Sequence, residues 1–107
     1  MKLGFIIETA DSERVWNAFR LANTALDAGH TVDVFLLGDG VTVPDIDTEK
    51  FNPTGVLRKF ILNNGSLYAC GTCMESRNLE AGDLRPHATM QDLLAIVEQS
   101  DKTITIG

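Results

Sequence analysis

Two cysteines with Cys-x-x-Cys spacing are the residues of this chain best suited to chemistry. Cys70 and Cys73 are its only cysteines, and they follow a short apolar run, Leu67-Tyr68-Ala69, that predicts a buried strand. A thiol between the end of a strand and the start of a helix meets unpaired backbone N–H groups and the positive end of the helix dipole, and both favour its thiolate form. The tetrapeptide therefore predicts reactive sulfur chemistry.

A fixed positive charge follows the second cysteine by one helical turn. Arg77 would favour the thiolate in the same way as the helix dipole. An equally good interpretation is a solvated helix residue, or an ion pair with Glu80. We take Cys70, Cys73 and Arg77 as the candidate site residues, the cysteines for sulfur chemistry and the arginine for electrostatic support.

The length and charge of the chain restrict the classes of protein to which it can belong. Its 107 residues, 44% of them apolar, predict one domain that spans residues 1–107. The net charge of −6 would repel a phosphate backbone, so direct nucleic-acid binding is not expected. No run approaches the roughly 20 apolar residues that cross a bilayer, and residues 1–14 do not resemble an export signal. We expect a soluble cytoplasmic protein, in which closely spaced thiols are more often reactive than structural.

Apolar periodicity predicts strands that alternate with helices. Four strands are expected, at residues 3–7, 32–37, 66–70 and 103–106. Helices are expected between them, at residues 12–28, 53–63, 74–79 and 90–97. The segment from Glu80 to Ala88, which contains Gly82 and Pro86, has no clear prediction. The last helix would begin after Thr89 and would have an apolar stripe made of Met90, Leu93, Leu94 and Val97.

This alternation predicts an α/β fold with a mainly parallel sheet, because each crossover helix returns the next strand in the same direction. Ligands of such sheets bind beyond the carboxyl ends of the strands. Three separate segments would meet at that edge: Glu8-Thr9, Gly38-Asp39-Gly40 and Cys70 to Cys73. Their convergence is better support for a site than the tetrapeptide alone.

Four other polar residues are candidates for roles near the thiols. Asp39, between two glycines, is better explained as a turn residue than as a catalytic group. Glu8 is more simply a solvent-facing acid at a strand end, and His30 a residue at a helix end. His87 is expected on a surface loop, although it would suit a proton donor to a leaving thiolate if that loop folds over the cysteines.

These segments carry a resemblance to a known family. Ala69 to Arg77, the turn from Phe35 to Val41, and the Gly29-His30 helix end resemble the DsrE/DsrF-like family of small sulfur-relay proteins, over nearly the whole chain. The resemblance implies a three-layer, flavodoxin-like α/β/α fold and assembly into homotrimers or homohexamers. It also implies a cysteine that takes sulfane sulfur from a donor protein as a persulfide and passes it to an acceptor protein.

The resemblance assigns a role to each cysteine. Cys70 matches the persulfide-carrying position, whereas Cys73 is an addition found in part of the family, and Asn78 stands where glycine often follows the arginine. A partly exposed thiol at a helix N-terminus could attack a donor persulfide and release the sulfur again. Cys73 could then act as a resolving thiol that releases sulfide or closes a disulfide with Cys70.

Two other functions stay open. The cysteine spacing also suits a thiol–disulfide oxidoreductase, although the motif follows the third strand and has no flanking tryptophan or proline. The chain could instead be a non-catalytic scaffold subunit of a DsrE-like complex. A zinc site is poorly supported, because two cysteines supply half of a closed ligand set. No organic cofactor is expected, since the glycines after the second strand form no dinucleotide fingerprint.

Overall fold

A five-stranded sheet lies at the centre of the computed structural model, which describes residues 1–107. The strands are β1 (Lys2–Ile7), β2 (Thr31–Leu36), β3 (Ser66–Cys70), β4 (His87–Ala88) and β5 (Lys102–Ile106). The helices are α1 (Ser12–Asp27), the 3-10 helix η1 (Gly38–Asp45), α2 (Pro53–Leu62), α3 (Gly71–Ser76) and α4 (Met90–Gln99). The structure thus contains the four predicted strands and one more.

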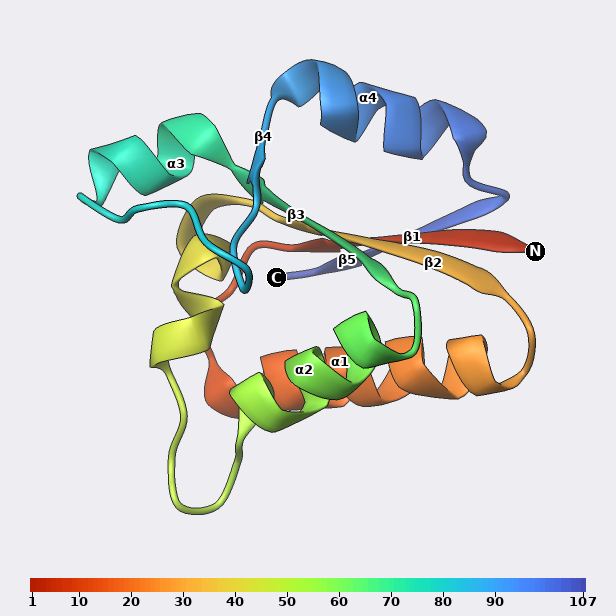
Figure 1. The fold of residues 1–107 in the computed structure, drawn as a ribbon, viewed down its shortest axis with the longest axis horizontal. Helices are drawn as coiled ribbons and strands as arrows, with labels where there is room; N and C mark the ends of the chain where they lie inside the picture. Colours follow the sequence, from red (N-terminus) through yellow and green to blue (C-terminus); the bar gives the residue numbers. More distant parts are fainter.

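The strands are all parallel, in the order β4-β3-β2-β1-β5. Helices α1 and α2 cover one face of the sheet and α4 the other, while α3 follows directly from the end of β3 (Figure 1). The predicted three-layer α/β/α fold is confirmed. None of the helices combines the length and the apolar composition that crossing a membrane requires.

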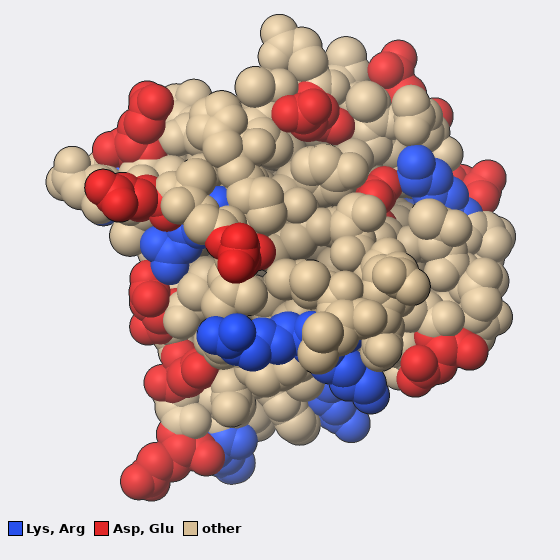
Figure 2. All heavy atoms as spheres, in the orientation of Figure 1, with Lys and Arg blue, Asp and Glu red and all other residues tan.

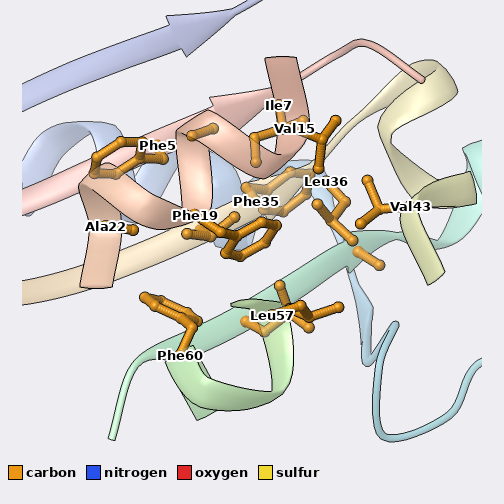
Figure 3. Close-up of a cluster of buried hydrophobic side chains, with 14 of the residues drawn as sticks. Phe5, Ile7, Val15, Phe19, Ala22, Phe35, Leu36, Val43, Leu57 and Phe60 are labelled. Atoms are coloured by element: carbon orange, nitrogen blue, oxygen red, sulfur yellow. The ribbon is translucent and has the colours of Figure 1, made fainter. Parts of the chain in front are cut away.

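The main core lies between the sheet and the two helices α1 and α2. Phe19 of α1 and Phe60 of α2 meet edge to face with ring centroids 5.6 Å apart (Figure 3). Phe5 and Ile7 of β1 are fully buried beneath them. Helix α1 begins where Asp11 accepts a hydrogen bond from the Arg14 N–H. This core leaves the carboxyl ends of the strands free to hold a site.

Two elements beside the cysteines differ from the sequence-based prediction. Strand β4 lies inside the segment that had no clear prediction, where the Ala69 N–H donates to the Pro86 carbonyl at 2.7 Å. Two residues are too few to leave an alternating pattern. Helix α3 begins at Gly71 instead of residue 74, because Cys70 itself is its N-cap, and it ends before Asn78, whose φ of 55° is left-handed.

Most of the predicted apolar stripe of α4 faces outward, and of its four residues only Leu93 is half-buried and packs against the core. Met90, Leu94 and Val97 are exposed by 58%, 57% and 43%, whereas Ile96 is buried. The reason lies in β1, where a Cβ atom on Gly4 would stand 3.0 Å from Ile96 Cγ2. The missing side chain lets α4 approach the sheet along Ile96, which leaves Met90, Leu94 and Val97 facing outward.

The predicted turn after β2 continues as η1 and passes very close to β1. A Cβ atom on Gly40 would overlap the carbonyl oxygen of Ile7. Because the obstacle is backbone in a buried strand, it cannot move aside. The glycine therefore allows η1 to pack against the carboxyl end of β1.

We expect Gly40→Ala to lower the free energy of unfolding by about 1–3 kcal/mol, the usual cost of overpacking, as measured by urea denaturation. Gly82→Ala is the matched control, because a Cβ atom there has nothing within 4 Å, and its effect should stay within about 0.5 kcal/mol. Equal unfolding free energies for the two variants would contradict the close approach.

Candidate thiol site

The two thiols lie where β3 passes into α3. Cys70 ends the strand and caps the helix, and its Sγ accepts a hydrogen bond from the Cys73 N–H at 3.4 Å. Both cysteines are free. Only 4% of Cys70 is exposed, so the expectation of a partly exposed thiol at this position is wrong, and Cys73 is the more accessible of the two. The strand end is buried because β2 and β4 flank β3 on both sides.

Cys73 is held from two directions. Its Sγ accepts a hydrogen bond from the Gly38 N–H at 3.3 Å. Burial raises the pKa of the Cys73 thiol, and the hydrogen bond with the Cys70 side chain raises it further, while the Gly38 N–H and the Arg77 charge act in the opposite direction. The expectation that its surroundings favour a thiolate is therefore wrong for Cys73, because desolvation outweighs the nearby charge.

Arg77 joins α3 to the start of η1. Its guanidinium donates to Asp39 Oδ1 at 2.8 Å and to the Cys73 carbonyl at 3.1 Å. Its carboxylate partner is thus Asp39 and not Glu80, since the sheet brings the ends of β2 and β3 together. Asp39 has a second role beside that of a turn residue, because it orients the arginine next to the thiol pair.

A hollow of about 480 Å³ opens beside the thiols, between α3, β4 and the start of α4. Its volume is in the range of small-molecule pockets. The lining residues are Cys70, Thr72, Cys73, Glu75, His87, Ala88, Thr89, Met90 and Gln91. Both cysteines therefore line one space, which is large enough for a small thiol compound or for a side chain of another protein.

His87 belongs to this hollow through β4. A Cβ atom on Gly71 would overlap Nε2 of the His87 imidazole and would stand 3.0 Å from its Cε1. The ring therefore rests on the backbone next to Cys70, and the segment after α3 does fold over the cysteines. Glu8 is exposed and does not line the hollow, in agreement with its simpler interpretation as a strand-end acid. His30 lies at the opposite edge, where its Nδ1 is 2.9 Å from the Met1 amine.

The charge around the hollow is mainly negative. Figure 2 shows more acidic than basic side chains on the visible face around α3 and the start of α4. Glu75 lines the hollow itself, and Asp92 receives the Thr89 N–H at 2.8 Å beside it. No group of three or more His, Cys, Asp or Glu side chains gathers where it could hold a metal ion.

The fold and the site together define a small parallel α/β protein with a strand-end thiol pair. More specifically, the chain belongs to the DsrE/DsrF-like family, whose model matches residues 1–106. The resemblance that the cysteine segment and the turn after β2 carry is thereby confirmed.

Similar proteins match nearly the whole chain. The uncharacterized protein MJ0989 of Methanocaldococcus jannaschii is 37% identical over 113 residues, which cover 98% of this chain and 99% of that protein. The uncharacterized protein MK0008 of Methanopyrus kandleri is 37% identical over 101 residues, covering 86% and 81%. The crystal structure of the ychN protein from E. coli has the same fold, with a TM-score of 0.84 at 23% identity, over 99% of this chain and 100% of that one.

If the Arg77 charge acts on the thiol, Arg77→Gln should slow the alkylation of Cys73 by iodoacetamide at every pH below the midpoint. The pKa of Cys73 should rise further, because burial would be less opposed. The rate is followed against pH in a Cys70→Ser background, so that Cys73 is the only thiol. Arg20→Gln is the control, since Arg20 stacks on Trp16 of α1, 4.4 Å from the ring centroid. Identical pH profiles for both variants would contradict the electrostatic role.

Proposed function

We propose that this protein carries sulfane sulfur as a persulfide on Cys70 and passes it to a partner. The observation that carries the proposal is the placement of Cys70 in a chain of the DsrE/DsrF-like family. Its sulfur caps α3, and Cys70 and Cys73 both line one hollow. Following the family resemblance, both the donor and the acceptor are proteins. We propose the cytoplasm as the location, because a reducing compartment keeps closely spaced thiols free.

The transfer needs no external oxidant or reductant. The Cys70 thiolate attacks the terminal sulfur of a donor persulfide, the S–S bond of the donor breaks, and the bonding electron pair leaves with the donor thiolate. Cys70 then holds the sulfur as a persulfide. In the second transfer an acceptor thiolate attacks the outer sulfur, and the Cys70 thiolate leaves. A buried sulfur that reaches solvent through a hollow suits a carrier, because it protects the persulfide from other thiols.

Cys73 is the resolving thiol in this proposal. Its raised pKa keeps it protonated near neutral pH, which disfavours it as the first nucleophile. When it loses its proton it can attack the inner sulfur of the Cys70 persulfide, which closes a disulfide and releases hydrosulfide. Arg77 holds the Cys73 backbone in place through its hydrogen bond to the carbonyl.

A second candidate function is thiol–disulfide exchange. The hydrogen bond between the two cysteine side chains favours it, because it sets the sulfurs close together. In that case the pair would cycle between dithiol and disulfide and would hold no extra sulfur. The two functions differ in the mass of the loaded protein.

We expect the reduced protein to gain the mass of one sulfur atom after incubation with a cysteine desulfurase and cysteine. The gain should survive in Cys73→Ser and disappear in Cys70→Ser, because Cys70 holds the sulfur. Intact-mass spectrometry measures all three proteins, and a reducing agent should remove the added mass.

Other outcomes favour the alternatives. If no variant, Cys73→Ser included, gains sulfur and the wild-type protein only loses two hydrogens on oxidation, the result would favour the oxidoreductase. No change in any protein, with assembly intact, would favour a scaffold subunit.

We also propose that the chain assembles with copies of itself into a trimer or hexamer through α4. Met90, Leu94 and Val97 form a continuous exposed apolar surface on this helix, which we call the α4 stripe. Three large apolar side chains spaced along one helix face support contact with another chain more than single scattered ones do. Met90 also lines the hollow, so a neighbouring copy on the stripe would lie beside the thiols.

Leu94→Glu should shift the protein from a trimer or hexamer to a monomer, since a charge in the middle of the α4 stripe would be buried without a partner. Multi-angle light scattering after size exclusion gives the mass. Leu62→Glu is the matched control, because Leu62 is 81% exposed on α2, on the other side of the sheet. Dissociation of the Leu62 variant alone would indicate that the interface lies on the α2 side of the sheet.

A further inference from the structure

His87 shares the hollow with both thiols but has no part in the transfer described so far. Its imidazole occupies the space that a side chain at residue 71 would fill, and Nε2 is the atom nearest to the position of that Cβ. Gly71 is the first residue of α3 and is bonded directly to Cys70. No hydrogen bond ties the imidazole to another side chain, so its ring nitrogens are free to exchange protons.

Transfer of sulfur to Cys70 creates a negative charge on the leaving donor sulfur, and the His87 imidazole could neutralise that charge. When the S–S bond of a donor breaks, the donor sulfur leaves as a thiolate, and an alkyl thiolate is a poor leaving group. A proton delivered during bond breaking lowers that barrier, and histidine is the side chain best suited to give one near neutral pH. Arg77 cannot do this, because its guanidinium keeps its protons and is bound to Asp39.

We propose that His87 is a general acid that protonates the sulfur leaving the donor as Cys70 takes up the transferred sulfur. The inference rests on the proposed function for its physiological substrate, an alkyl persulfide. Cys70 thiolate, His87 imidazolium and the donor persulfide give the Cys70 persulfide, neutral His87 and the donor thiol. One S–S bond forms and one breaks, and His87 regains its proton from water.

Few titratable groups lie near His87. The titratable groups that line the hollow with it are the two thiols and Glu75 of α3. Asp92 stands at the start of α4, where it accepts hydrogen bonds from Thr89. No Lys or Arg side chain lines the hollow.

The test compares two reagents that place the same methylthio group on Cys70. Dimethyl disulfide releases methanethiolate, which needs a proton, whereas S-methyl methanethiosulfonate releases a sulfinate, which does not. Rates are measured by intact mass near neutral pH in a Cys73→Ser background, with His87 and with His87→Gln. His30→Gln is the matched control, because His30 lies at the opposite edge of the sheet beside Met1.

His87→Gln should lower the ratio of the disulfide rate to the thiosulfonate rate by about 10²-fold, and His30→Gln should leave it unchanged. Gly71→Ala should lower the ratio as well, since its methyl group would displace the imidazole without altering His87. An unchanged ratio in His87→Gln would overturn the proposal, whether both rates stay the same or fall together as a packing defect would make them. Failure of Cys70 to react with either reagent would overturn it too.

This outcome is independent of the sulfur-relay test. The wild-type protein could take no sulfur from a desulfurase while the ratio still falls in His87→Gln. In that case the sulfur-relay proposal is wrong, but His87 still acts as a general acid. If the protein loads sulfur while the ratio is unchanged, the relay stands and His87 has no part in it.

Discussion

The hydrogen bond from the Cys73 N–H to the Cys70 sulfur joins the parts of the molecule on which the site depends. One residue ends a central strand, caps the next helix and supplies the thiol. Because the sulfur acts as the cap, α3 has to begin at Gly71, and the second thiol falls one turn away on the same side. Changing the position of the cap would move both thiols relative to the sheet. The start of α3 and the positions of the two thiols are therefore fixed by the same residue.

Opposing electrostatic effects act on the pKa of Cys73. A positive charge and a backbone N–H lie near Cys73, yet burial beside another thiol has the larger effect and raises the pKa of Cys73. Arg77 donates hydrogen bonds to Asp39 and to the Cys73 carbonyl, so its main effect is to hold α3 and η1 together. Arg77, which the sequence predicted to favour the thiolate, is thus first a positioning residue.

The sheet explains how such distant residues meet. In a parallel sheet the loops that follow neighbouring strands lie at one edge, so Gly38 reaches Cys73 from β2 and His87 reaches Gly71 through β4. The strand order reverses between β1 and β5, but the thiols lie at the other side of the sheet, at β3 and β4. There the two-residue β4 leaves room for the hollow, which a longer strand and its side chains would narrow.

The sequence by itself determined the α/β alternation, the parallel sheet and the position of the thiols, because apolar periodicity and the helix-start residues act over a few neighbours. It predicted His87 on a surface loop, where the residue would suit a proton donor on one condition, that the loop folds over the cysteines. Only the tertiary structure decided that condition, the pairing of Arg77 with Asp39 and the outward face of α4. Each of these depends on packing between residues far apart in the chain, such as Ile96 against Gly4. Local sequence patterns do not predict such contacts.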